Sequence, residues 1–268
     1  MFVIGERING MFEDVKRAIL GHKAEVIQDL ARRQIGAGAS ALDVNVGPSV
    51  RDSTEAMLWL VETIRAVTDA PVAIDTAKWE LMSDVIPRVP GEKIINSSKA
   101  DPEAAMKYIE LARDNDAGLI GLTIDADGVP GTIEKRVELG VQLIALAMEA
   151  GMKMDRLFID PVILPVNVAP QNPGHCMAAI SQIRAFADPA PHLVLGLSNV
   201  SQRCNNRGLI NRTYLAMAMA HGLDAAIMDP FDTELMDTAI TVELLLEKMI
   251  YCDSYLEAAR CARVANGG

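Results

Sequence analysis

The 268-residue sequence has no excess of basic residues: Lys and Arg number 25, Asp and Glu number 36, and the formal net charge is −11. The basic surface that nucleic-acid-binding proteins carry is therefore missing, and we expect no nucleic-acid partner. Metal-ligand spacings are missing as well, because the four histidines are scattered and the four cysteines form no CxxC pair, so we expect no metal site. Reduced thiols in a cytoplasmic protein are the simplest interpretation of these cysteines. The cysteines are Cys176, Cys204, Cys252 and Cys261.

Long apolar runs are also missing. The first residues, MFVIGERING, have neither the basic start nor the apolar stretch of a signal peptide. No uncharged apolar run approaches the ~20 residues that a membrane-spanning helix needs. We therefore expect neither a signal peptide nor a membrane span. Hydrophobic residues still make up 50% of the chain, which is enough for the core of one domain over residues 1–268.

Short apolar runs alternate with amphipathic stretches along the whole chain. Most of the runs are apolar throughout, which indicates strands buried on both faces, as in a parallel sheet. Eight strand–helix units without a linker favour an α/β fold with a single (β/α)₈ TIM barrel over an open doubly wound sheet. No GxGxxG motif follows the first run, which further disfavours a dinucleotide-binding sheet. The predicted strands are 2–8, 41–46, 72–76, 93–97, 118–124, 157–164, 193–198 and 225–229.

The amphipathic stretches predict the helices between these strands, and two of their boundaries have clear physical causes. Asp101 precedes Pro102 and is suited to cap the helix that starts there. Gly222 follows His221, where a left-handed residue is expected to end a helix. The clearest predicted helices are 25–36, 53–68, 102–115, 132–150 and 212–221.

Nearly every predicted strand ends in Asp or Asn. Any one of these residues is explained by a helix cap or a turn. In a (β/α)₈ barrel, however, the carboxyl ends of all strands converge on one mouth, where the active site lies. A ring of carboxylates and amides there suits a flat heterocycle with many N–H and C=O groups. The sequence has no Ser-His-Asp set, phosphate loop or strand-end lysine, so we expect hydrogen bonding and orientation rather than covalent catalysis.

Characteristic motifs follow one another along the chain: GERIN at 5–9, DVNVGP at 43–48, IDT at 74–76, INSS at 95–98, IGLT at 120–123, IDPVILP at 159–165, LGLSNVSQRCNNR at 195–207 and NRTYLAMAMAHGLDAAIMD at 211–229. Taken together, these motifs resemble those of the methyltetrahydrofolate:corrinoid/iron–sulfur-protein methyltransferases and their close relatives in corrinoid-dependent demethylation systems. The resemblance covers essentially the whole chain. It implies a barrel of the pterin-binding, dihydropteroate synthase-like type that forms a homodimer.

The resemblance also implies roles for individual residues. Asn199 would approach N5 of a folate and donate the hydrogen bond that stabilises the transition state, with Asp160 in a supporting network. These two are the expected catalytic residues. Glu6 and Asn9 match the motif of the first strand, without an assigned role. The expected pterin- and folate-binding residues are Asp75, Asn96, Asp160, Gly196, Ser198, Asn199, Gln202 and Arg207.

The implied activity is that of a methyltransferase acting between N5 of tetrahydrofolate and the cobalt of a corrinoid, in a direction that the residues do not set. The chain has no DxHxxG corrinoid motif, so a separate corrinoid protein is the expected partner. Loops containing Gly10, Met11, Phe12 and Gly47 are its candidate contacts, although Met11 and Phe12 also suit packing on the first helix.

Two alternatives remain. One is a protein that binds a pterin or folate without catalysis, which would share Asp75, Asn96 and Asp160. The other is a dihydropteroate synthase-like transferase. That reading is disfavoured because Ser198-Asn199 and Asp229-Pro230 stand where its lysine and His-Asp pair are expected.

Overall fold

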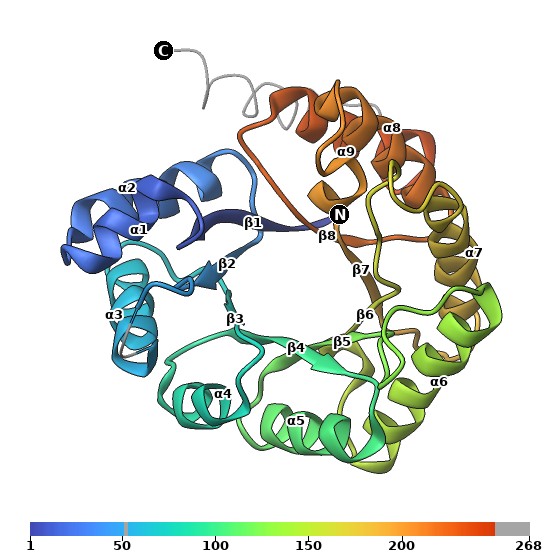
Figure 1. The fold of residues 1–268 in the computed structure, drawn as a ribbon, viewed down its shortest axis with the longest axis horizontal. Coiled ribbons are helices and arrows are strands. Elements are labelled where there is room, and N and C mark those ends of the chain that lie inside the picture. The colour runs from blue at the N-terminus through green and yellow to red at the C-terminus, as the bar shows by residue number, and fades with distance from the viewer. Residues whose placement is uncertain (51–52, 250–268) are drawn as a thin grey trace.

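The structure is a computed structural model and describes residues 1–50 and 53–249. Eight parallel strands, each paired with its neighbours in chain order, close into one barrel, with β8 pairing back onto β1 (Figure 1). This closed order confirms the predicted barrel and excludes the doubly wound sheet. The strands are β1 (Phe2–Asn9), β2 (Ala41–Asn45), β3 (Val72–Asp75), β4 (Lys93–Lys99), β5 (Gly118–Leu122), β6 (Leu157–Asp160), β7 (His192–Gly196) and β8 (Ala225–Met228).

Helices surround this barrel as an outer ring (Figure 1). None of the helices in the described ranges is long and apolar enough to cross a membrane. The helices are α1 (Glu13–Leu20), α2 (Ala24–Gly36), α3 (Ser53–Arg65), α4 (Trp79–Val85), α5 (Pro102–Asp114), α6 (Ile133–Glu149), α7 (Asn172–Arg184), α8 (Arg207–Ala220) and α9 (Thr233–Leu245), with short 3₁₀ turns η1 (Ile86–Arg88), η2 (Met154–Arg156) and η3 (Leu197–Ser201).

Both predicted helix boundaries are confirmed. The Asp101 carboxylate accepts the N–H of Ala104 at 2.9 Å and so caps α5. Gly222 adopts φ +107° directly after the end of α8, a conformation that side chains disfavour. Cys252 and Cys261 lie outside the described residues.

Two predicted segments differ most from the observed bounds. The run 157–164 is a strand only as far as Asp160, because Pro161 has no N–H for the ladder and Val162 turns to φ +62°. The helix predicted at 212–221 already begins at Arg207, so Arg207 belongs to α8 rather than to a loop.

The core has two layers. The larger layer fills the space between the strands and the surrounding helices. The smaller one fills the inside of the barrel, and each strand contributes one residue to it. These residues are Ile4, Ala41, Ala73, Ile94, Ile120, Phe158, Val194 and Ala225. Floor residues are direct register partners between β1 and β2, β3 and β4, β5 and β6, and β7 and β8, and together the eight side chains form an apolar floor across the barrel.

Candidate pterin site at the barrel mouth

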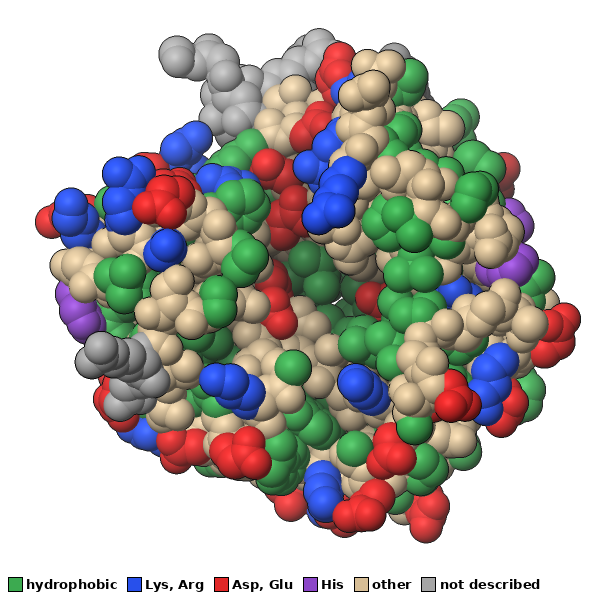
Figure 2. All heavy atoms as spheres, viewed as in Figure 1, with side chains coloured by type: hydrophobic (Ala, Val, Ile, Leu, Met, Phe, Trp, Pro, Cys, Tyr) green, Lys and Arg blue, Asp and Glu red, His purple; other side chains and the backbone are tan. Residues whose placement is uncertain are grey.

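A polar layer lies directly above the apolar floor. Side chains two positions apart in a strand point to the same side, so the residue that follows each floor residue by two faces the inside, nearer the mouth. At five of the eight strands this residue is acidic or an amide, and Figure 2 shows acidic side chains lining the hollow at the centre of this face. The five residues are Glu6, Asp43, Asp75, Asn96 and Asp160.

Strands β2, β3 and β4 are linked at this level by two side-chain hydrogen bonds. Asn96 donates its amide N–H to Asp43 Oδ1 at 2.9 Å, which joins β4 to β2 past the intervening strand β3. Asn45 donates to Asp75 Oδ2 at 2.7 Å, and its own Oδ1 accepts the N–H of Gly47 at 2.6 Å. Each bond engages only one atom of Asp75 and one of Asn96. One carboxylate oxygen of Asp75 and the carbonyl oxygen of Asn96 thus receive no hydrogen bond from the described part of the chain.

Burial makes these carboxyls weak acids. Burial raises the pKa of Asp43 well above its usual range, the nearby charge of Asp75 raises it further, and the hydrogen bond from Asn96 partly offsets both. Burial also raises the pKa of Asp75, against the hydrogen bond from Asn45. Two such carboxyls, close enough for their charges to interact, resist ionising together. Burial therefore favours the protonated form most strongly for Asp43, the more deeply buried of the two.

Asp160 ends β6 on the other side of the mouth. Its Oδ1 accepts the N–H of Val162 at 2.7 Å. Burial raises the pKa of Asp160 to about 7, while the backbone N–H groups of Val162 and Gly196 and the charge of Arg136 act in the opposite direction. Near neutral pH this carboxyl therefore exists in both forms, as suits a group that holds or releases a proton.

The loop after β7 completes the mouth. Ser198 donates its hydroxyl to Glu6 Oε1 at 2.8 Å and so ties this loop to β1. Burial raises the pKa of Glu6 to about 7, with the bond from Ser198 opposing the shift. Asn199 is exposed and lies close over Gly196: a Cβ atom at position 196 would come within 2.9 Å of Asn199 Nδ2. Glycine is therefore needed at 196 if the Asn199 amide is to lie over the strand end.

The structure brings most of the expected site residues to one place. Arg207 frames the loop from α8, donating from Nε to Ser201 Oγ and from Nη2 to the carbonyl of Ser198, both at 3.1 Å. Gln202 is exposed on the same loop. Asn9 accepts the N–H of Met11 at 2.9 Å and so serves the turn after β1.

Sequence reasoning missed Asp43, a member of the polar layer, and Asn45, the next inward-facing residue of β2. It did not assign a role to Asp43 or Asn45, although both face the barrel interior and hold Asn96 and Asp75. The available signal was their spacing. Two polar residues two positions apart in the apolar run 41–46 must share one face of a buried strand.

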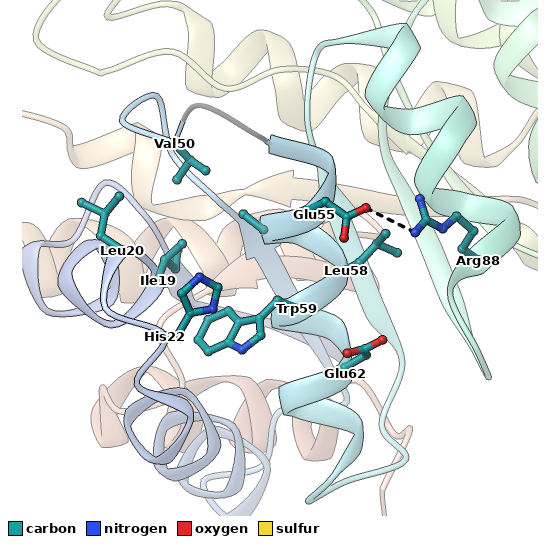
Figure 3. Close-up of a pocket in the computed structure, with 10 residues that line it drawn as sticks. Ile19, Leu20, His22, Val50, Glu55, Leu58, Trp59, Glu62 and Arg88 are labelled. Carbon is teal, nitrogen blue, oxygen red and sulfur yellow. Dashed lines mark hydrogen bonds and ion pairs between the residues drawn. The ribbon is translucent and has the colours of Figure 1, made fainter.

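A groove of about 510 Å³ lies away from this site, on the outer side of the barrel between α1 and α3 (Figure 3). In it the ring of His22 meets the edge of Trp59, with 5.1 Å between centroids, and Glu55 pairs with Arg88 at 3.4 Å. None of the strand-end residues lines this groove. Within residues 1–50 and 53–249, no group of three His, Cys, Asp or Glu residues is arranged to hold a metal ion.

Comparison with known proteins identifies the family. The profile of the pterin binding enzymes matches residues 11–229, so the chain belongs to the pterin-binding enzyme family. A methylcorrinoid:tetrahydrofolate methyltransferase of Eubacterium limosum is 29% identical over 266 residues, which span 98% of each chain. Methionine synthase of Mycobacterium leprae is 28% identical over 242 residues, which span 85% of this chain and only 20% of that protein.

Solved structures support the same fold. A dihydropteroate synthase of Coxiella burnetii, in complex with pteroic acid, superposes with a TM-score of 0.67 over 92% of this chain and 94% of its own. At 15% identity this likeness shows the barrel fold and no more. The resemblance noted from the sequence motifs is confirmed by the family match and the full-length relative.

The raised pKa values predict how stability depends on pH. The folded pKa of about 7 for Asp160 lies above the unfolded value of ~4, so the folded chain holds the extra proton between these pH values. The stability that this proton provides is complete below pH ~4 and is lost as the pH rises through about 7. Asp160→Asn keeps the shape without the charge. We expect it to stabilise the folate-free protein at pH 8 by roughly 4 kcal/mol.

Thermal unfolding between pH 4 and 8 measures this effect. The matched control is Asp127→Asn, at an exposed aspartate in the loop before α6, which should follow the wild-type curve. An Asp160→Asn curve parallel to that of the wild type would contradict the assignment of a raised pKa to Asp160.

Proposed function

We propose that the chain is a methyltransferase that moves a methyl group between N5 of tetrahydrofolate and the cobalt of a corrinoid, with residues 1–268 forming one domain. The corrinoid is carried by a separate protein. The full-length relative, 98% covered, is named for transfer from a methylcorrinoid to tetrahydrofolate, which favours methyl capture by tetrahydrofolate as the direction. A cytoplasmic location fits the unpaired thiols of Cys176 and Cys204.

The observation that carries this proposal is the set of acceptors at the ends of β3, β4 and β6. Asp75 and Asn96 each present one oxygen that no described residue satisfies, and Asp160 presents a carboxyl that accepts backbone N–H groups. Acceptors that line the mouth of a barrel are available to the donors of a ligand. A reduced pterin carries a 2-amino group and ring N–H groups, and these are the donors that such a set of oxygens fits.

The arrangement of Asn199 and Asp160 suits chemistry at N5. A methyl group leaves N5 slowly if the nitrogen must depart as an anion, and a proton or a strengthening hydrogen bond there lets it depart as a neutral amine. Asn199 offers an amide N–H over the strand end. Asp160, with a pKa of about 7, is suited to hold the proton that N5 gains or loses. Gly196 lies beside both side chains and places them on one wall.

The side that is open to a partner is the rim beside β1 and β2. Met11 is 72% exposed, and Phe12 is 37% exposed with the guanidinium of Arg7 3.9 Å from its ring centroid. These exposed fractions favour the interpretation of Met11 and Phe12 as partner contacts over their packing against α1. The loops that carry Gly10 and Gly47 are in close contact, since a Cβ atom at 47 would lie 2.7 Å from the Gly10 carbonyl oxygen. We propose this rim as a contact for the corrinoid protein.

A spectroscopic assay tests the proposed reaction. Reduced cobalamin is mixed with methyltetrahydrofolate and, separately, methylcobalamin with tetrahydrofolate, and the cobalt spectrum reports methylation or demethylation. We expect enzyme-dependent transfer in both mixtures. Binding of tetrahydrofolate without any transfer, also with a corrinoid protein present, would instead identify a pterin-binding protein without this activity.

Replacement of Asn199 tests its proposed role. Asn199→Ala removes the donor at N5, and we expect kcat to fall by about 10²–10³-fold with a smaller change in KM for the folate. Steady-state kinetics of methyl transfer measure both constants. Asn205→Ala, at an exposed residue of the same loop, is the matched control and should keep wild-type rates. An Asn199→Ala protein with unchanged turnover and folate binding would rule the assignment out.

A homodimer is supported by an apolar surface on α8. A groove of about 280 Å³ runs between α7 and α8, beside Leu209 and Met217, which are 59% and 48% exposed. Met219 of the same helix is buried in the core. Exposed apolar side chains along a groove are typical of an interface between subunits.

Charge introduced on this surface should separate the subunits. We expect Leu209→Glu/Met217→Glu to convert a dimer into a monomer, because carboxylates would have to be buried without partners. Light scattering after gel filtration measures the mass. Met148→Glu, on the exposed side of α6, is the control and should remain a dimer. A wild-type protein that is monomeric at micromolar concentration would contradict the proposed dimer.

A further inference from the structure

Arg136 is a buried cation on α6. Its guanidinium makes no hydrogen bond to a carboxylate of residues 1–50 or 53–249 and donates instead to backbone carbonyls. Nη1 donates to the carbonyls of Pro161 and Val162, the latter at 2.9 Å, and Nη2 donates to Pro130 at 2.9 Å. A buried charge is unfavourable unless its surroundings compensate for it. Two of the three compensating carbonyls belong to the turn directly after β6.

That turn has an unusual backbone conformation. Val162 adopts φ +62°, in the left-handed region that β-branched residues rarely enter. The conformation directs the Val162 N–H back to Asp160 Oδ1, at 2.7 Å. Strained backbone of this kind persists only where the surroundings hold it. The two bonds from Arg136 to the carbonyls on either side of this N–H provide such a hold.

Arg136 also contributes the charge that acts on Asp160. Besides the N–H groups of Val162 and Gly196, the ionisable groups that interact with Asp160 are Arg136, Cys176 and Tyr214, from α6, α7 and α8. Burial raises the pKa of Cys176 to about 12 and raises the pKa of Tyr214 as well, so both remain neutral. Arg136 therefore supplies the positive charge that favours the carboxylate form of Asp160.

We propose that Arg136 is a positioning residue that acts on the folate through Asp160. It fixes the turn that orients the Asp160 carboxyl, and its positive charge favours the carboxylate form. This inference rests on the proposed role of Asp160 in binding the pterin. Arg136 itself is buried and contacts the turn from α6, in the outer ring of helices.

Two variants separate the charge of Arg136 from its hydrogen bonds. Arg136→Gln removes the charge and keeps one donor group, whereas Arg136→Lys keeps the charge and loses the forked geometry. The titration of Asp160 is followed by ¹³C NMR in folate-free protein labelled at the aspartate carboxyls, with Asp160→Asn to assign the signal. We expect Arg136→Gln to raise the titration midpoint by about one pH unit, a tenfold change in proton affinity. Arg136→Lys should raise it by less than half as much.

Binding of tetrahydrofolate, measured by calorimetry across the same pH range, gives the second readout. The pH at which affinity begins to fall should move with the midpoint of Asp160 in Arg136→Gln. In Arg136→Lys the affinity should fall several-fold while its pH dependence stays near that of the wild type. Arg113→Gln, at an exposed arginine of α5, is the control for loss of a positive charge and should change neither quantity.

A lower melting temperature with an unmoved Asp160 midpoint in both variants would overturn the proposal, since Arg136 would then only support the fold. If both variants fail to fold, Val162→Gly decides. Glycine adopts the left-handed conformation freely, so a turn held by Arg136 should keep the wild-type midpoint and affinity. A large change in either would show that the Val162 side chain sets the turn.

Should the wild type bind no tetrahydrofolate, the proposed function fails, while the folate-free titration still tests the action of Arg136 on Asp160.

Discussion

The site depends on one constraint, the burial or partial burial of several carboxyl groups in a single layer at the mouth of the barrel. Alternation along the strands places this layer one step above the apolar floor, which separates it from the other end of the barrel. Each carboxyl must therefore be protonated, hydrogen-bonded by a neighbour, or satisfied by something that enters from the mouth. Asp43 illustrates the first two solutions together, because burial favours its protonated form and Asn96 donates to it.

The remaining acceptors are held in place without being fully satisfied. Asn45 and Asp43 occupy one atom of Asp75 and one of Asn96, and this fixes the orientation of both side chains before any ligand arrives. A ligand that donates to the free oxygens then gains these bonds without the entropic cost of ordering the side chains. The same arrangement lowers the stability of the empty protein near neutral pH. This trade-off is common where a binding site is built from buried polar groups.

The apolar runs and the helical periodicity between them were sufficient to predict the eight strands. The polar strand ends were predictable too, because a strand buried on both faces accommodates Asp or Asn mainly at its end. These patterns did not predict which polar ends pair. Asn96 in β4 donates to Asp43 in β2, with β3 between the two strands. Ser198, in the loop after β7, donates to Glu6 in β1, with β8 between them. These contacts depend on barrel closure and register, which a local pattern does not contain. Arg136 was missed for a related reason: an arginine within an amphipathic helix is expected at the surface, and only the turn after β6 explains its burial.

The residues expected to bind the ring lie deeper in the mouth than the residue expected to act at N5. Asp75, Asn96 and Asp160 lie at or below the level of the strand ends and are suited to hold one edge of a flat ring, whereas Asn199 is exposed on the loop above. A ring anchored by its deep edge turns its opposite side towards the opening. An atom on that side can meet a second reactant only if the reactant approaches from outside the barrel. The apolar floor closes the other end. A large corrinoid on a separate protein is a reactant of this kind, and an open rim rather than a closed pocket is what its approach requires.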